Sequence, residues 1–403
     1  MSFQTGLSGL SAASRNLDVI GNNIANANTV GMKTSRAEFA DLVASSLGVG
    51  GGNSTGIGVE VANTSQLFSQ GNINIPATTL TLRSNGGGFF QLNMPDGSSA
   101  YTRNGQFKLD SVGNIVTNAG GKLLGYPTDA AGTTTSTTIQ PLVLPTTAPI
   151  AAKQTTTIAA TLNLDARAPI ISPPVSPIAT TYGTSLNAFD SQGVSLPVSL
   201  YFSKVTPTTA GTDEWAVYDN PSGATIGSMV FDATGKLSSS TIGTITLTPP
   251  APSIVPAFPV TVDVSKVTQF GASFAVSSLT QNGYAPGELV GIKVGEDGVI
   301  TARYSNGQTQ AAGQFALADF RNVQGLAQMG GGNWIETFAS GQPVLGAPGI
   351  GKMGGLRAGA LEESNVDLTS ELVNMMTAQR AYQANAQTIK TQDQVLSTLV
   401  NLR

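Results

Sequence analysis

The residues that could carry catalysis in this chain are carboxylates, lysines, tyrosines and serines, because its 403 residues include no His and no Cys. This composition excludes Ser-His-Asp and Cys-His nucleophile pairs, together with haem and zinc sites held by His or Cys. The segment GAPGIGKM, residues 346–353, has the G-x-x-x-x-G-K spacing of a phosphate-binding loop, but Met353 stands where a Ser or Thr would bind magnesium. Gly354 and Gly355 follow where a helix should begin, so the segment favours a flexible loop over a nucleotide site.

Two adjacent acid pairs, Glu296-Asp297 and Glu362-Glu363, are candidates for the paired carboxylates of a polysaccharide-acting enzyme. Neighbouring side chains on a strand point to opposite faces, and Asp297 begins an Asp-Gly turn, so the first pair is typical of a solvated turn. The second pair precedes a predicted helix, where exposed acidic charges are favourable. We therefore predict no catalytic residues, no metal site and no cofactor.

Aromatic residues offer a third possible site, since Trp215, Trp334 and the pair Phe89-Phe90 could stack on sugars or bases. Aromatics make up only 6% of the chain, which is too sparse for such a platform, so these residues are predicted to lie in the core. The net charge of −4 and the absence of a Lys/Arg cluster exclude nucleic acid as a partner. The sequence has neither about 18 consecutive apolar residues nor the pattern of a cleavable signal peptide, so we predict no membrane insertion.

Both ends of the chain have the apolar spacing of helices, with alternating steps of four and three residues. Such stripes are narrow for a globular core, and a pair of helices alone would be marginal in water, so we predict that they pair as a coiled-coil-like core completed by neighbouring copies. The alternative is that they pack inside one domain as ordinary amphipathic helices. The predicted subunit-assembly residues are Phe3, Leu7, Leu10, Leu17, Ile20 and Ile24 at the N-terminal end, and Leu368, Leu372, Met375, Tyr382, Ile389, Leu396 and Val400 at the C-terminal end.

Between the helices the apolar period changes to two, and Gly-containing turn dipeptides separate short runs of Thr, Val, Ile and aromatic residues. We predict a multidomain, mainly β fold with helical termini and nested antiparallel β domains. The run TDAAGTTTSTTIQP, residues 128–141, is predicted to lead into the inserted module, and the Gly-rich run at residues 45–60 to be a flexible connection. The predicted domains are a terminal helical core (1–29 and 364–403), connecting segments (30–75 and 359–363), an inner β domain (76–145 and 281–358) and an inserted outer β domain (146–280).

Six stretches of the sequence resemble one known family. SGLSAASRNLDVIGNNIANANTVGMKTSRAEF, residues 8–39, and ESNVDLTSELVNMMTAQRAYQANAQTIKTQDQVLSTLVNLR, residues 363–403, resemble the terminal signatures of bacterial flagellar rod and hook proteins. Residues 87–127 and 281–308 are similar to the inner β domain of these axial proteins. FDSQGVSLPVSLYFSKV and DEWAVY, in the predicted insert, resemble the outer domain of the hook branch. Met32 departs from the family, which usually has an aromatic residue there.

The resemblance implies a structural subunit without enzyme activity that polymerises into the flagellar hook, a flexible tubular universal joint that passes motor torque to the filament and forms part of the export channel. It implies homopolymer contacts, and contacts with the rod, the hook cap, the hook-filament junction protein and the flagellar type III export apparatus. It also implies an extracellular location in the flagellum, reached without a cleavable signal peptide. The alternatives are a distal rod subunit of the same family and a secreted carbohydrate-binding or carbohydrate-active β protein.

Overall fold

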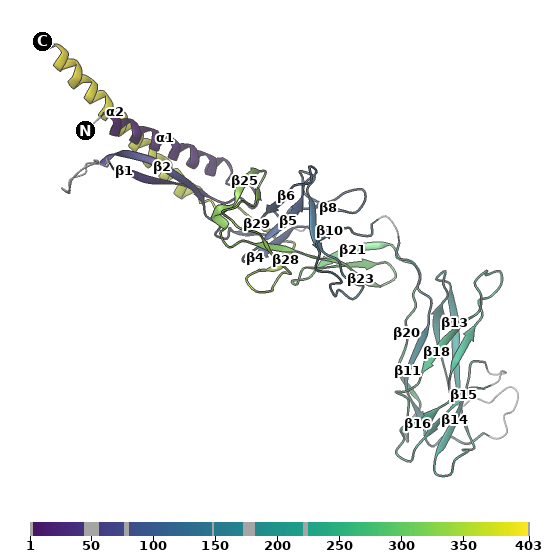
Figure 1. The fold of residues 1–403 in the computed structure, drawn as a ribbon. Coiled ribbons are helices and arrows are strands. Elements are labelled where there is room, and N and C mark those ends of the chain that lie inside the picture. The colour runs from purple at the N-terminus through teal and green to yellow at the C-terminus, as the bar shows by residue number, and fades with distance from the viewer. Residues whose placement is uncertain are drawn as a thin grey trace. The chain divides into compact units, whose positions relative to one another are not determined.

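The computed structural model describes residues 3–43, 56–75, 80–146, 149–171, 182–220 and 225–401. The chain divides into two compact units (Figure 1). The first unit comprises Met1–Thr147, Gly291–Ala302 and Gln310–Arg403, and the second comprises Ala148–Val290 and Arg303–Thr309. Most of the Gly-rich run predicted as a flexible connection lies outside the described residues, but Gly56 to Glu60 belong to a strand.

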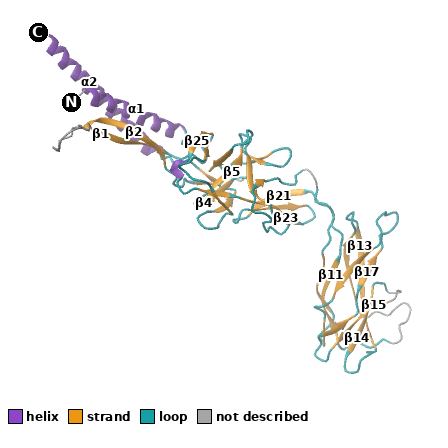
Figure 2. Ribbon diagram, in the orientation of Figure 1, coloured by secondary structure: helices purple, strands orange, loops and turns teal. Residues whose placement is uncertain are grey.

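The ends of the first unit carry the two α-helices of the described chain, α1 (Phe3–Ala25) and α2 (Leu368–Asn401). Asp367 caps α2, since its Oδ1 accepts the backbone N–H of Thr369 at 2.9 Å and of Ser370 at 3.3 Å. The antiparallel strands β1 (Ser35–Val43) and β2 (Gly56–Gln66) form a hairpin. Helix α1 packs against both α2 and this hairpin (Figure 2).

A large sheet forms the β part of the first unit. In the described residues it has 13 strands, and its main path runs β21-β22-β23-β9-β5-β6-β26-β25. Every pairing that we describe in it is antiparallel, as the turn dipeptides predict. The path strands are β21 (Leu289–Val294), β22 (Val299–Tyr304), β23 (Thr309–Phe315), β9 (Lys122–Tyr126), β5 (Phe89–Asn93), β6 (Ser99–Thr102), β26 (Asn333–Ile335) and β25 (Ala327–Gly330). The branches are β7 (Lys108–Leu109), β8 (Ile115–Val116), β10 (Gln140–Pro141), β24 (Leu317–Asp319) and β27 (Val344–Gly346).

Two small ladders connect this sheet to the helices. Strand β3 (Ile73–Asn74) pairs with β29 (Leu361–Glu362), and β4 (Leu82–Asn85) pairs with β28 (Gly355–Ala358). A 3₁₀ turn, η1 (Val323–Gly325), precedes β25. The segment by which the chain enters the β part of the unit therefore lies beside the segment by which it leaves.

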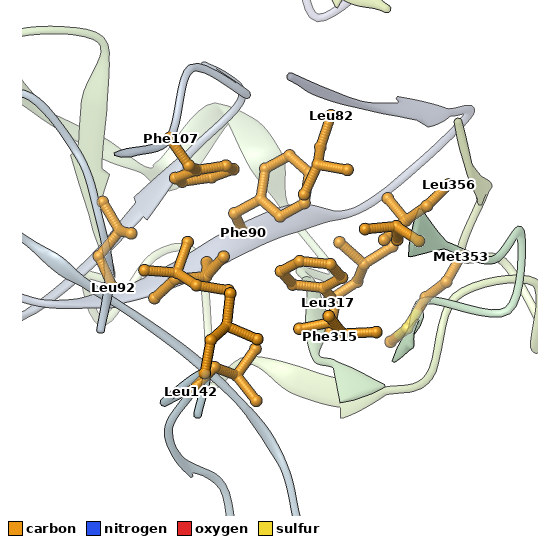
Figure 3. Close-up of a cluster of buried hydrophobic side chains, with 14 of the residues drawn as sticks. Leu82, Phe90, Leu92, Phe107, Leu142, Phe315, Leu317, Met353 and Leu356 are labelled. Carbon is orange, nitrogen blue, oxygen red and sulfur yellow. The ribbon is translucent and has the colours of Figure 1, made fainter. Parts of the chain in front are cut away.

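Both faces of the large sheet are covered by apolar side chains. On one face, Phe90 packs edge-on against Phe107, with ring centroids 5.2 Å apart, inside the cluster drawn in Figure 3. On the other, Phe89 packs against Trp334 at 5.6 Å. Neighbouring residues of one strand therefore serve opposite faces, as the strand geometry requires. Phe89, Phe90, Trp215 and Trp334 are all buried, which confirms their prediction as core residues.

The second unit consists, in its described residues, of two five-stranded sheets. One contains β11 (Thr157–Asp165), β17 (Thr244–Leu247), β18 (Phe258–Asp263), β19 (Thr268–Phe270) and β20 (Ala275–Gln281), and the other β12 (Tyr182–Phe189), β13 (Ser195–Val205), β14 (Asp213–Tyr218), β15 (Thr225–Phe231) and β16 (Leu237–Ser240). Alternate residues of β11 and β18 share one core with Phe202, Trp215 and Phe231 from the other sheet. Strand β11 pairs in parallel with β18 and β19, a departure from the predicted all-antiparallel arrangement.

Acidic turn residues predict how stability depends on pH. Three aspartates in turns have a pKa below the ordinary 3.8, because a nearby side chain donates a hydrogen bond to each carboxylate. The donors are Ser98 for Asp96, Asn114 for Asp110 and Thr234 for Asp232. These folded-state pKa values lie below the unfolded ones, so the stabilisation is present above pH 3.8 and is lost as the pH falls through the folded values.

Because the chain has no His, we expect the free energy of unfolding to change little between about pH 5 and pH 8 and to fall below pH 3.8. Urea unfolding followed across this range measures the dependence. Asp110→Asn should reduce the acid loss, since the Asp110 carboxylate accepts the side-chain amide of Asn114 at 2.6 Å. An acid limb that is identical in this variant would contradict the assignment.

Candidate assembly surface and its buried junction

The two terminal helices pack antiparallel, and small residues bring them close together. A Cβ added at Gly6 would lie 3.0 Å from Cγ1 of Ile389, and one added at Gly9 would lie 3.0 Å from the amide of Asn385. At the other end of α1, the side-chain amide of Asn23 lies 3.5 Å from Glu371 Oε2. The residue numbers of each pair have nearly the same sum, which is the mark of one continuous antiparallel register.

Some of the predicted assembly residues lie in this helix contact. Ile20 is buried, and Leu10, Leu17, Ile24, Met375 and Ile389 are half-buried. The contact also uses residues that an apolar stripe does not reveal, among them the glycines of α1 and the buried Ala378 of α2. The glycines at positions 6 and 9, one helical turn apart, are the signal that could have located this face.

The other predicted assembly residues are not covered by the chain's own helices. Leu368, Leu372 and Tyr382 on α2, and Phe3 and Leu7 on α1, are between 37% and 52% exposed. Val373 and Met376, which lie beside the predicted stripe, are each 52% exposed. The side chain of Val400 lies outside the described residues. An apolar surface of α2 is therefore open to a partner.

Helix α2 also extends beyond the start of α1. The register places Phe3, the first described residue of α1, opposite the region of Gln392, whereas α2 continues to Asn401 (Figure 1). Val395 and Leu396 on this overhang are each 49% exposed. Leu396 lies seven residues after Ile389 and so continues the face that contacts α1. Among the described residues, no part of α1 lies opposite this face of the overhang.

The hairpin fixes α1 from its other side. The backbone N–H of Val59 donates to Ser8 Oγ at 3.3 Å. Near the end of the helix, the buried Asn23 donates to Ser35 O at 2.8 Å and accepts the Ser35 N–H at 3.0 Å. The position of α1 is therefore set by the hairpin as well as by α2.

A buried ion pair joins the helices to the β part of the first unit. Lys33 Nζ lies 2.6 Å from Glu362 Oε1 and also donates to Ser69 O at 2.7 Å. Their side chains are 0% and 2% exposed, and the guanidinium of Arg103 lies 3.9 Å from the second carboxylate oxygen. Glu362 Oε1 also accepts the backbone N–H of Gly71 at 3.1 Å. We call this group, together with Asn365, the junction.

Asn365 completes the junction with its side-chain amide. Its Oδ1 accepts the backbone N–H of Thr34 at 2.7 Å, and its Nδ2 donates to Leu67 O at 2.7 Å. Gly31 has a φ of +74° and lies so close to Arg103 that a Cβ would come within 2.9 Å of its backbone. Four segments distant in sequence are therefore fastened at one point, just before α2 begins.

Burial shapes the electrostatics of the junction. It lowers the pKa of Lys33, an effect opposed by the hydrogen bond and charge of Glu362. It also lowers the pKa of Arg103, against the charges of Glu362 and Asp319. The interpretation of Glu362 as a solvated helix-start charge is therefore wrong. Its cation is 329 residues away in the sequence and could not be seen from the local pattern.

The two remaining candidate sites, Asp297 and the GAPGIGKM segment, lie in a turn and in a loop, as the sequence predicts. Asp297 is exposed in a turn, where it accepts the Val299 N–H at 3.1 Å. The GAPGIGKM segment is a loop followed by strand β28 rather than by a helix, and its Met353 is buried in the core. Among the described residues no group of three or more acidic side chains is placed to hold a metal ion. No helix in the described ranges is long and apolar enough to cross a membrane.

The junction makes a prediction about stability. Lys33→Met would leave the Glu362 carboxylate buried without its cation, which should lower the free energy of unfolding by about 3 to 5 kcal/mol. The double variant Lys33→Met/Glu362→Gln should lose less than the single one, because the buried carboxylate is then neutral and Arg103 keeps its hydrogen bond to Gly86 O and the charge of Asp319. Urea unfolding of the full chain measures both.

The exposed pair Arg36–Glu38, 3.1 Å apart with side chains 64% and 41% exposed, provides the matched control. Arg36→Met should cost less than about 1 kcal/mol, since water screens that pair. Equal losses for Lys33→Met and Arg36→Met would show that the junction pair contributes nothing beyond a surface contact.

Four family descriptions match separate parts of the chain. Residues 3–33 match "Flagella basal body rod protein", and residues 357–402 match "Flagellar basal body rod FlgEFG protein C-terminal". Residues 84–161 match "Flagellar hook protein FlgE/F/G D1 domain", and residues 161–284 match "Flagellar basal body protein FlaE D2 domain". The matches at residues 3–33 and 357–402 contain α1 and α2, and the match at residues 161–284 covers most of the two sheets of the second unit.

Curated relatives match over the full chain. The flagellar hook protein FlgE of Escherichia coli K12 is 43% identical over 419 residues, and that of Salmonella typhimurium is 42% identical over 424, each covering 100% of both chains. The Treponema pallidum protein is 32% identical over 460 residues, with 100% of this chain and 99% of the relative covered. The crystal structure of Helicobacter pylori FlgE2 covers 70% of this chain and 99% of its own, at 16% identity and a TM-score of 0.53, which shows a shared fold.

These relatives confirm the resemblance, the fold class and the choice of the hook over the rod and carbohydrate alternatives. Full-length identity of this size with several hook proteins is specific, since it spans both helices and both β units. The chain therefore belongs to the flagellar hook protein family and is a structural, non-enzymatic subunit of the bacterial flagellum.

Proposed function

We propose that this chain polymerises with copies of itself, and that the uncovered apolar residues of its terminal helices are the contacts that join neighbouring subunits. The observation that carries the proposal is the overhang of α2, on which Leu396 continues the α1-contacting face beyond Phe3, the first described residue of α1. A second copy can supply the missing helix. A repeated contact of this kind, made between different surfaces of each copy, generates an open helical assembly.

The helix contact within one chain is thin, and this supports completion by neighbours. The buried apolar residues that α1 contributes are Ala12, Ala13 and Ile20, and α2 contributes Ala378. Small side chains remove little apolar surface from water, at roughly 25 cal/mol per Å². Several larger apolar side chains of both helices remain exposed and others are only half-buried, so the pair gains further burial in a polymer.

The division of labour follows from the same contacts. We propose that the terminal helical core (1–29 and 364–403) forms the wall of the tube and that the inner β domain (76–145 and 281–358) supports it. The connecting segments (30–75 and 359–363) contain Lys33, Ser69, Gly71 and Glu362 of the junction, so they transmit torque as a fixed link. The outer β domain (146–280) contacts neighbours at the surface. By family resemblance, the further partners are the rod, the hook cap, the hook-filament junction protein and the type III export apparatus, and the location is extracellular without a cleavable signal peptide.

Charge placed on the exposed stripe tests this proposal. Leu372→Asp and Leu396→Asp should each abolish polymerisation, because the carboxylate would be buried between subunits without a partner. Sedimentation and electron microscopy of the purified chain under polymerising conditions measure the effect. The β part of the first unit and the second unit should unfold at the same urea concentration as in the unchanged chain, since both side chains are exposed.

Thr377→Asp is the matched control, because Thr377 is exposed on the same helix and lies five residues, or about 140° of rotation, away from Leu372. It should polymerise normally. Tubes formed by Leu372→Asp and Leu396→Asp would refute the assignment of these residues to the assembly surface.

The thin helix contact gives a second prediction. The isolated subunit should have less helix than the polymer, because the terminal helices lack most of their partners in solution. Far-ultraviolet circular dichroism of the free and the polymerised chain compares the two. Equal helix content would show that the ends fold without neighbours.

A further inference from the structure

One aromatic side chain of the first unit is held entirely in solvent. Phe338, in the loop between β26 and β27, is 105% exposed. Hydrogen bonds fix the loop on both sides of it. Thr337 Oγ1 accepts the backbone N–H of Ala339 at 3.1 Å, and Ser340 Oγ donates to Thr337 O at 2.9 Å. The amide of Asn322 donates to Ala339 O at 3.1 Å. A large apolar group presented by an ordered loop is typical of a contact residue, since aromatic side chains are enriched in interfaces.

The same unit contains a cavity of about 630 Å³ with apolar walls. The apolar walls are formed by Val299, Leu345, Ala347 and Ile350, and Thr133, Thr134 and Thr137 border them. The cavity thus lies between the Thr-rich run after Thr128 and the phosphate-loop-like segment GAPGIGKM. Its volume is within the range of about 300 to 1,000 Å³ that receives small groups, and a phenyl ring fits within it.

The shape of the Thr-rich wall is fixed. The Asp129 carboxylate accepts the backbone N–H groups of Ala131 at 3.1 Å and Thr133 at 2.8 Å. The backbone N–H of Ala311, in β23, donates to Ala130 O at 3.2 Å. A Cβ at Gly132, whose φ is +95°, would lie 3.3 Å from Val299 Cγ1. The run is therefore a structured wall, and the cavity does not have to form on binding.

Charged side chains of both signs lie beside Phe338 and beside the cavity. Exposed Glu336 and Arg321 lie in the loops that hold Phe338, and Glu336 accepts the hydroxyl of Tyr101 at 3.0 Å. Exposed Asp297 lines the cavity, and exposed Lys352 lies two residues after Ile350, which contributes to its wall. The cavity side thus presents the cation Lys352 together with the anions Asp129 and Asp297, so Glu336 can face Lys352 while Arg321 faces Asp297.

We propose that Phe338 of one copy inserts into this cavity of a second copy. The proposal rests on the polymerisation proposed above, and it adds a contact between β parts to the contacts between helices. Phe338 and the cavity are different surfaces of the same chain, so every copy offers one of each and the contact repeats without closing. The paired charges set the direction of the contact, and burial of the ring supplies its affinity.

Removal of the ring tests the contact. Phe338→Ser should raise the critical concentration for polymerisation about 10- to 100-fold, as expected for loss of one buried phenyl group. Ile254→Ser is the matched control, because Ile254 is 86% exposed and lies in the second unit. It should polymerise like the unchanged chain, and both variants should keep the unchanged urea midpoint because neither side chain is packed.

An unchanged critical concentration for Phe338→Ser would overturn this inference and leave the proposed polymerisation intact. It would also be the result if Phe338 served a different protein. Failure of the unchanged chain to polymerise would instead overturn the proposed function, and this contact with it.

A charge exchange tests the direction of the contact. Glu336→Lys and Lys352→Glu should each raise the critical concentration, and the double variant should return it toward the unchanged value. A double variant that is no better than either single one would refute the pairing.

Cross-linking locates the contact directly, because the chain has no Cys of its own. Phe338→Cys/Ile350→Cys polymers should form a ladder of disulfide-linked chains on oxidation, since such a bond needs Cα atoms within about 7 Å. Ile254→Cys/Ile350→Cys polymers should not. No ladder from the first pair, in polymers that are otherwise intact, would overturn the contact.

Discussion

The buried pair of Lys33 and Glu362 is the interaction on which the geometry of the first unit depends. Taking two charges out of water is costly unless each is well partnered, and here the ammonium and the carboxylate lie 2.6 Å apart with backbone groups on their remaining sites. A misaligned pair would lose this compensation. The position of the helices on the β part of the unit is therefore sharply defined, which is what a subunit that transmits torque requires.

The terminal helices follow a different physical principle. Their mutual contact is close and uses glycine, alanine and asparagine beside Ile20, whereas several of their large apolar side chains remain exposed. The specificity of the pair thus comes largely from steric fit. In the proposed polymer, neighbouring copies would cover the exposed apolar side chains, so the junction would set position within the chain and contacts between chains would supply affinity.

Much of this could be read from the sequence, and the omissions have definite causes. Apolar periodicity located both helices, and the turn dipeptides located the antiparallel strands, because these signals are local. The register of α1 on α2 was not visible, because Gly6, Gly9 and Ala378 carry no hydrophobic signal. Glu362 was misread because its partner Lys33 lies in another segment. The cavity beside Ile350 was hidden for the same reason, since its two walls come from loops that only the sheet brings together.

The junction and the helix pair also set an order of events for the chain. Lys33 and Glu362 are separated by 329 residues, and α1 and α2 are the first and last elements of the molecule. Contacts over such distances close late, because the intervening chain must first become compact. The sheets of the second unit lie wholly inside this interval and can fold before it closes. Under the proposed polymerisation, the surfaces that join one copy to the next would be the last part of the molecule to be completed, which would keep a half-folded chain from joining the polymer.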